Sequence, residues 1–128
     1  MKEVKLNGNT KEQMPRPVYN QCLWIVRDYK RLIEMDKYIR ENIPDGEHSF
    51  VYYADSSEGL LKKEVLENAR FQIKCVEESF SVIPEEFRKG IYENIAEKVP
   101  FDFDTSINTW KKWKSRFIKQ LAQKLNLY

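Results

Sequence analysis

The chain has 128 residues, enough for one compact domain with a buried core but not for two large ones. Charged residues make up 33% of it, and only four Gly and five Pro are present, so long helices are favoured over short strands joined by tight turns. No apolar stretch is long enough to span a membrane and the N-terminal residues lack a signal-peptide core, so we expect a soluble cytoplasmic protein with no membrane contact.

The first third of the sequence predicts a tail followed by a long helix. Residues 1–14 are polar and show no periodicity, so we expect a flexible tail. Pro15 and Pro17 suit the start of a helix, because proline fits the first turn. Apolar residues then recur at helical spacing, which predicts a helix over about 18–43. Its apolar stripe consists of Val18, Cys22, Ile25, Tyr29, Leu32, Ile39 and Ile43.

A loop and a second long helix come next. Residues 44–57 are irregular, and their aromatic run has no partner strand, so we expect a loop that packs its rings on the helices. Residues 57–83 again show helical spacing, with Leu66, Ala69, Ile73, Val76, Phe80 and Ile83 on one side. Two helices of similar length are expected to pack antiparallel. Residues 15–83 therefore predict a helical hairpin.

The remaining residues, 84–128, predict two shorter helices. Pro84 suits the first position of a helix over 84–98, and the two Glu that follow it favour the positive end of the helix dipole. The helix is expected to end before Pro100, because the residue preceding a proline is pushed out of the α region. A short connector leads to Thr105 and Ser106, which suit a helix N-cap. Helix, connector and helix form the outline of a helix-turn-helix, so the fold class expected is all-α.

The last helix is strongly cationic. Residues 105–128 contain six basic side chains and no acidic one, whereas the preceding 104 residues hold 16 of the 22 basic and all 20 acidic side chains. On a helical projection, one arc of about 140° collects Trp110, Trp113, Phe117, Ile118, Leu121 and Leu125. We expect these residues to be core and not a base-stacking platform. Lys112, Ser115, Arg116, Lys119 and Gln123 occupy the opposite side, and Lys114 falls inside the apolar arc, where it must snorkel or meet a carboxylate.

Two parts of the sequence resemble a known family. The segment PRPVYNQCLWIVRDYKRL and the ending IPEEFRKGIYENI followed by TWKKWKSRFIKQLAQKLNL resemble small phage and prophage transcription regulators of the RinA/ArpU type. The resemblance covers roughly residues 15–43 and 76–128. It implies an activator of late phage genes whose C-terminal part is similar to the promoter-reading helix-turn-helix of sigma factors. In that motif Ile83-Pro84 would open the first helix and residues 108–119 would form the recognition helix. A sigma-like motif also has a supporting helix, for which only about eight residues are available, so it is one turn long around 102–106 or missing.

These observations predict a protein that binds double-stranded DNA with its last helix. The candidate contacts are Asn108, Thr109, Lys111, Lys112, Ser115, Arg116 and Lys119. Arg116 suits a bidentate contact to guanine, and Lys111 and Lys119 suit phosphates. RNA polymerase is a further candidate partner. Trp24, Ile33, Met35 and Tyr38 extend beyond the main apolar stripe of the first helix, which makes a homodimer another.

Other chemistries have little support in the sequence. Cys22 and Cys75 are isolated, so we expect buried reduced thiols, and His48 is the only histidine, so neither a metal site nor a cofactor is expected. The chain has no phosphate-binding Gly-rich loop, GxSxG or HExxH motif, and we expect no enzymatic activity. The alternative function is that of a non-catalytic helical interaction protein, such as a phage assembly adaptor or a partner of another regulator.

Overall fold

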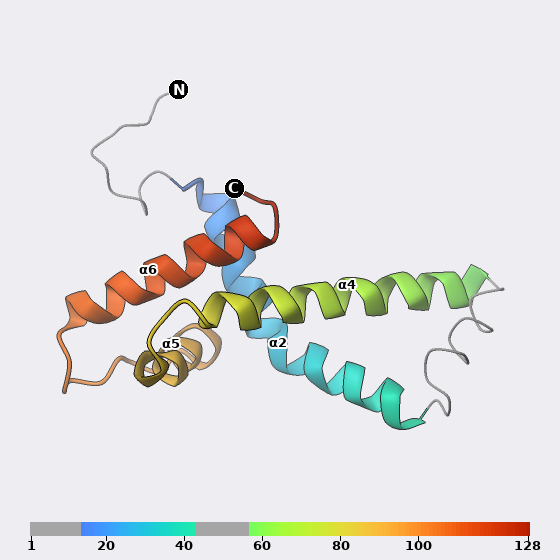
Figure 1. Cartoon of the computed structure of the whole chain (residues 1–128), viewed down its shortest axis with the longest axis horizontal. Helices are drawn as coiled ribbons and strands as arrows, with labels where there is room; N and C mark the ends of the chain where they lie inside the picture. The colour runs from blue at the N-terminus through green and yellow to red at the C-terminus, as the bar shows by residue number, and fades with distance from the viewer. Residues whose placement is uncertain (1–13, 43–56) are drawn as a thin grey trace. The chain divides into compact units, whose positions relative to one another are not determined.

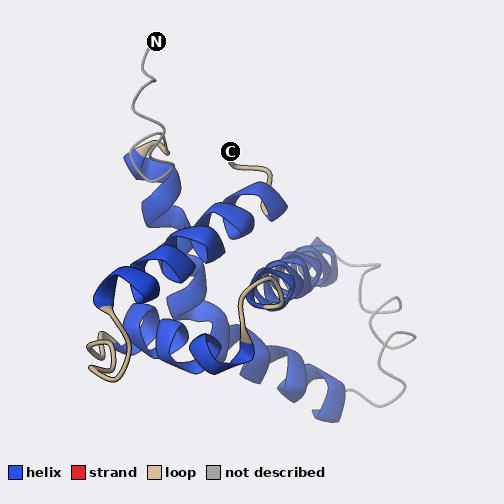
Figure 2. Cartoon of the chain, turned by 60° about the vertical axis from the view of Figure 1, so that its left-hand side comes forward, coloured by secondary structure: helices blue, strands red, loops and turns tan. Residues whose placement is uncertain are grey.

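The computed structural model describes residues 14–42 and 57–128, and side chains in all of these except 42 and 57–63. The described residues form four α-helices and no strand, so the all-α prediction is confirmed for them (Figures 1 and 2). The helices are α2 (Arg16–Asn42), α4 (Ser57–Phe80), α5 (Glu85–Glu97) and α6 (Ile107–Lys124). Most of the tail expected at 1–14, the loop expected at 44–57 and His48 lie outside the described residues. None of the helices described is both long enough and apolar enough to cross a membrane.

The ends of α2 and α4 follow from the proline residues around them. The backbone N–H of Tyr19 donates to the Pro15 carbonyl (3.1 Å), so Pro17 lies in the first turn of α2. A backbone N–H in the first turn has no intrahelical partner, so proline, which lacks this group, fits there. α4 ends at Phe80, three residues before the predicted end. Ile83 precedes Pro84 and is therefore kept out of the α region. Instead, residues 81–83 form a turn in which Arg88 Nε donates to the Ile83 carbonyl (2.9 Å).

α5 starts and stops within one residue of its predicted limits. Pro84 is its N-cap and not its first helical residue, and Glu85 and Glu86 occupy the first turn at the positive end of the helix dipole. Lys98 ends the helix in the left-handed conformation with φ 58°, and the next N–H, of Val99, donates to the Glu93 carbonyl (3.2 Å). This arrangement satisfies carbonyls that would otherwise lack a partner at the helix end.

α6 is capped at both ends. The Ser106 hydroxyl accepts a hydrogen bond from the backbone N–H of Asn108 (3.2 Å), as its type predicts for an N-cap. At the other end Asn126 has φ 61°, and the N–H of Leu127 donates to the Ala122 carbonyl (2.9 Å). Asparagine tolerates this left-handed conformation better than most residues, so the last turn closes locally.

The described residues divide into two compact units. The first, named here the α6 unit, consists of residues 14–28 together with Cys75–Tyr128. The second consists of the described residues within Tyr29–Lys74. In the second unit Leu32, Leu66 and Ala69 are buried. In the same unit, the Asp36 carboxylate accepts a hydrogen bond from Arg70 Nε (2.8 Å) and forms an ion pair with Arg40 Nε (3.0 Å).

The packing of the α6 unit crosses the boundary that the sequence predicted at residue 83. The start of α2 supplies the buried residues Cys22 and Val26, and the end of α4 supplies Cys75 and Val76. Met14, the last residue of the expected tail, is also buried. α5 and α6 therefore share their core with both long helices. The antiparallel pairing of those helices along their whole length stays a prediction.

Candidate nucleic-acid interface

One side of α6 forms the core of the α6 unit. Its buried residues are Trp110, Phe117, Ile118, Leu121 and Ala122. Phe117 is fully buried and stacks on Phe80 of α4, with ring centroids 4.1 Å apart. The prediction that this side is core is confirmed for these residues except Ala122, which the sequence did not single out. Trp113 and Leu125, which the sequence also assigned to the apolar arc, are only half-buried.

Trp110 joins α6 to α5 and to the connector between them. Its ring meets Phe87 of α5 edge-on (4.9 Å, 84°) and stacks on Phe101 of the connector (5.0 Å, 6°). Its Nε1 donates to the Asp102 carbonyl (3.2 Å), which satisfies the one polar group of a buried indole. Gly90 of α5 lies directly beneath it, since a Cβ there would be 2.6 Å from Trp110 Cη2.

The C-terminal half of α6 is held by both long helices. The Cys22 thiol points to the Ile118 carbonyl (3.9 Å), and the Cys75 thiol to the Lys124 carbonyl (3.5 Å). Burial raises the pKa of the Cys22 thiol to about 11, so it stays protonated at neutral pH. Lys124 Nζ pairs with Glu78 of α4 (3.2 Å). One of the six C-terminal cations is thus neutralised within the unit.

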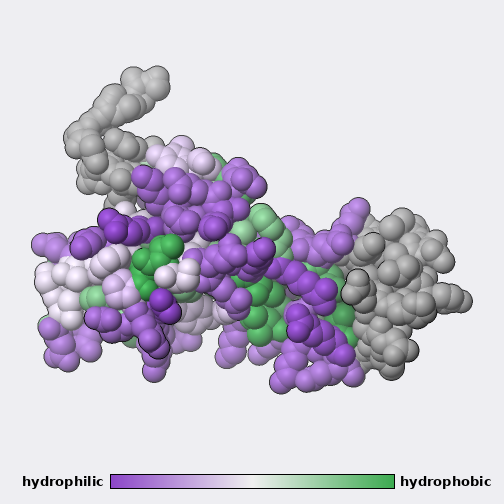
Figure 3. Space-filling model, viewed as in Figure 1, coloured by the Kyte–Doolittle hydropathy of each residue, from purple (hydrophilic) through white to green (hydrophobic). Residues whose placement is uncertain are grey.

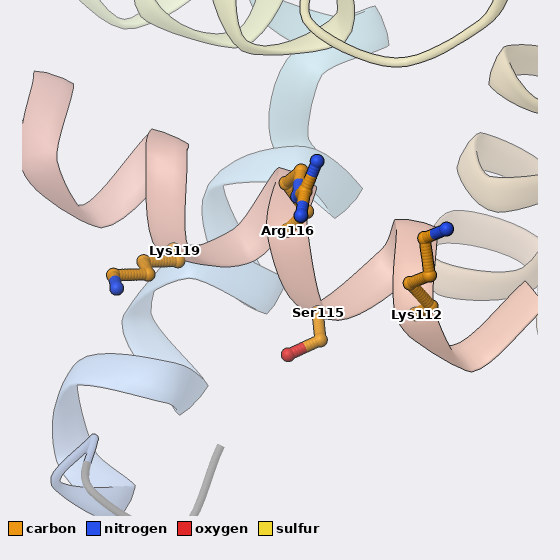
Figure 4. A pocket seen from close by; sticks show the side chains of 4 residues that line it. All are labelled: Lys112, Ser115, Arg116 and Lys119. Carbon is orange, nitrogen blue, oxygen red and sulfur yellow. The ribbon is translucent and has the colours of Figure 1, made fainter. Parts of the chain in front are cut away.

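The opposite side of α6 carries a hollow of about 310 Å³. It is lined by Lys112, Ser115, Arg116 and Lys119, which project from successive turns of one helix (Figure 4). Lys112 and Arg116 are exposed, and Ser115 and Lys119 are half-buried. Across residues 14–42 and 57–128 as described, no carboxylate pairs with any of the three cations. Four of the seven predicted contact residues therefore come together at one site, whose positive charge is not neutralised by any carboxylate of the described residues.

The other three predicted residues lie on α6 but do not line this hollow. Asn108 and Lys111 are exposed, and Thr109 is half-buried in the first turn. The Asn108 side chain is available because the cap uses only its backbone N–H. The first turn and the hollow together thus present polar and cationic groups along one helix.

Lys114, the misfit of the helical projection, turns toward α5. Its Nζ donates to the side-chain amide oxygen of Asn94, Oδ1 (2.8 Å). Asn94 is itself oriented by donating Nδ2 to the Val99 carbonyl (2.9 Å). Lys114 therefore fastens α6 to α5 and is separated from the hollow.

Trp113 is the residue near the hollow that the sequence assigned to a different role. Sequence reasoning placed it in the core, but it is half-buried, and Lys112 Nζ lies 4.6 Å and Arg116 Cζ 5.3 Å from its ring centroid. The spacing contained part of the signal, because Arg116 comes three residues after Trp113 and residues three apart are neighbours on a helix. The contact of the adjacent Lys112 with the ring depends on its rotamer.

The connector between α5 and α6 contains no supporting helix. It has nine residues, from Lys98 to Ser106, with only a turn at 103–104. Of the two outcomes that the sequence allowed, the missing helix is therefore the observed one. A short-turn helix-turn-helix has three or four residues at this point, so the α5–α6 pair departs from that geometry. Pro100 cannot donate a backbone hydrogen bond, and the stacking of Phe101 on Trp110 attaches the segment to α6.

The surface, the possible metal ligands and the comparisons with known proteins add three findings. On the face shown in Figure 3, hydrophilic residues cover most of the described surface, and hydrophobic residues form smaller patches. No group of three or more His, Cys, Asp or Glu among the described residues could hold a metal ion. No protein-family model, curated protein or solved structure matches the chain. Function is therefore inferred from the residues of α6 and their surroundings.

Proposed function

We propose that this protein is a DNA-binding transcription regulator that contacts double-stranded DNA with the cationic side of α6. One observation carries the proposal: Lys112, Arg116 and Lys119 border a single hollow without a carboxylate partner among the described residues. A buried opposite side fixes the helix beneath them. Uncompensated cations on a rigid helix are the electrostatic feature that attracts a phosphate backbone.

The proposed contacts follow from the shape of DNA. The major groove of B-DNA admits an α-helix, and residues in its N-terminal half come nearest the bases. Arg116 is the candidate for a bidentate bond to guanine, and Lys111 and Lys119 are candidates for phosphates. Asn108, Thr109, Lys112 and Ser115 are candidates for base edges or phosphates.

Other parts of the proposal rest on the resemblance to phage regulators. It supplies late genes as the target, activation as the effect and RNA polymerase as a second partner. A sigma-like docking geometry would have to accommodate the nine-residue connector, so we propose only that α6 enters the groove. A homodimer is supported by the 66% exposure of Trp24 and Tyr38 on α2, which leaves apolar surface for a second copy.

The proposal is tested by removing one cation and measuring binding to duplex DNA over a range of salt concentrations. Lys119→Ala should weaken binding almost equally across sequences and flatten the log–log salt slope by about one unit. Lys89→Ala is the matched control, because Lys89 is an exposed cation on α5 outside the hollow. Equal slopes for Lys119→Ala and wild type would remove Lys119 from the interface.

A non-catalytic interaction protein is the second candidate, and the connector favours it. Phe103 is 99% exposed between Asp102 and Asp104, and Ile107 is 52% exposed. Apolar side chains gathered at one exposed segment suit a protein partner better than DNA, which the two carboxylates would repel. This candidate predicts little affinity for duplex DNA at any salt concentration, whereas the first predicts steep salt dependence.

A further inference from the structure

Trp113 links α5 to the cations of the hollow. Its ring centroid lies 6.1 Å from that of Phe87 on α5, with the planes 32° apart. Two cations also lie over the ring, Lys112 Nζ at 4.6 Å and Arg116 Cζ at 5.3 Å from its centroid. Both of these cations line the hollow. One half-buried indole is therefore supported by α5 and contacted by two of the three charges proposed to meet DNA.

This arrangement opposes two effects that would otherwise scatter the cations. Lys112 and Arg116 are four residues apart on a helix, where like charges repel. Both side chains are long and lose considerable rotamer freedom when they are ordered. The face of an indole carries negative potential and attracts a cation within about 6 Å of its centroid. A ring shared by both side chains restricts them to one region in spite of their repulsion.

We propose that Trp113 is a positioning residue that orders Lys112 and Arg116 at the edge of the hollow before DNA binds. The ordering concerns the free protein, and its effect on binding rests on the proposed function. A bidentate bond from Arg116 to a base requires a fixed guanidinium plane. Rotamer entropy lost in advance does not have to be lost on binding, so the ordering strengthens the complex. Trp113 thereby acts through two other residues without a base contact of its own.

Three variants separate this role from simple packing. Trp113→Leu keeps an apolar side chain against Phe87 but removes the ring. Trp113→Phe keeps a smaller ring. Phe71→Leu is the matched control, because Phe71 is an exposed aromatic residue on α4 that does not line the hollow.

The first measurement uses the free protein. The side-chain methylene protons of Lys112 and Arg116 should show upfield ring-current shifts by NMR in wild type and in Phe71→Leu. The shifts should be reduced in Trp113→Phe and lost in Trp113→Leu. Wild-type protons at random-coil positions would overturn the proposal, whatever the protein does with DNA.

The second measurement is fluorescence anisotropy with a short duplex of randomised sequence over a range of salt concentrations. Trp113→Leu should bind about five- to thirtyfold more weakly, as expected for two exposed cation–π contacts, with an unchanged salt slope because no charge is removed. The affinity of Trp113→Phe should fall between those of Trp113→Leu and wild type, and Phe71→Leu should match wild type. Wild-type affinity in Trp113→Leu would overturn the proposal. If Trp113→Leu fails to fold, wild-type affinity in Trp113→Phe would overturn it instead. No binding by wild type refutes the proposed function instead, and the ring-current result then decides the ordering of the cations by itself.

Discussion

On one side of α6, Phe117 and Leu121 are fully buried, whereas on the other Lys112 and Arg116 are exposed and meet no carboxylate among the described residues. The buried side contacts α2, α4, α5 and the connector, so its residue types are accounted for by packing. Packing does not account for the residue types of the exposed side. A surface helix needs polar residues there, but it has no structural need to exclude acidic ones. The difference between the two sides separates what holds the protein together from what it presents to a partner.

The largest effect is expected on the buried side. Phe117→Ala should lower the free energy of unfolding by about 3–5 kcal/mol, because it removes a fully buried ring that stacks on Phe80. Urea denaturation followed by far-UV circular dichroism measures the change. Phe103→Ala is the matched control, since Phe103 is 99% exposed and should change stability by less than about 0.5 kcal/mol. Equal losses in the two variants would contradict the assignment of the core.

A second test adds an atom where Trp110 leaves no room. Gly90→Ala places a Cβ 2.6 Å from Trp110 Cη2 and should cost about 1–3 kcal/mol, although alanine is the better helix former. In a Trp110→Phe background the same substitution should cost less, because the smaller ring lacks the atoms that clash. A double-mutant cycle in urea measures this coupling. A stabilising Gly90→Ala in the wild-type background would show that α5 and α6 are not packed this closely.

The contact of the Cys22 thiol of α2 with the Ile118 carbonyl of α6 predicts that the free energy of unfolding depends on pH. Burial raises the pKa of the Cys22 thiol from its ordinary value of 9.0 to about 11 in the folded protein. The folded state therefore keeps its proton after the unfolded state has lost it. This contribution to stability is complete below pH 9 and falls by up to about 1.4 kcal/mol per pH unit as the pH rises toward 11. Cys22→Ala should be less stable at neutral pH but should lose less stability over that alkaline range, and parallel losses would contradict the burial of the thiol.

The smallest effects on stability are expected on the cationic side. Lys112→Ala and Lys119→Ala should each change the free energy of unfolding by less than about 0.5 kcal/mol, because neither residue pairs with a carboxylate among the described residues. Thermal melts in parallel with those of Phe117→Ala measure the difference. A loss of more than about 1 kcal/mol would mean that these side chains serve the fold, and the contrast between the two sides would disappear.

Much of the helical structure could be predicted from local patterns. The 3.6-residue period located all four described helices, and the prolines placed the ends of α4 and α5 to within three residues. The same period identified Trp110, Phe117 and Leu121 as buried.

The arrangement of the helices could not be predicted in the same way, because a period gives the face of a helix but not its partner. Val26 lies four residues after the buried Cys22, but the predicted stripe contained the neighbouring Ile25, which is only half-buried. Lys114 bonds to Asn94, which is 20 residues away. At the candidate site, four of the predicted residues line one hollow. The relation of Trp113 to two of them depends on rotamers that the spacing does not specify.

The most direct test of the proposed function is the salt dependence of duplex binding by the wild-type protein. If the cationic side of α6 contacts about four to six phosphates, the logarithm of the association constant should fall with the logarithm of salt concentration with a slope of about −4 to −5. Anisotropy titrations with a labelled duplex at several salt concentrations give this slope. An absence of binding at low salt, or a slope close to zero, would contradict a DNA-binding role for α6.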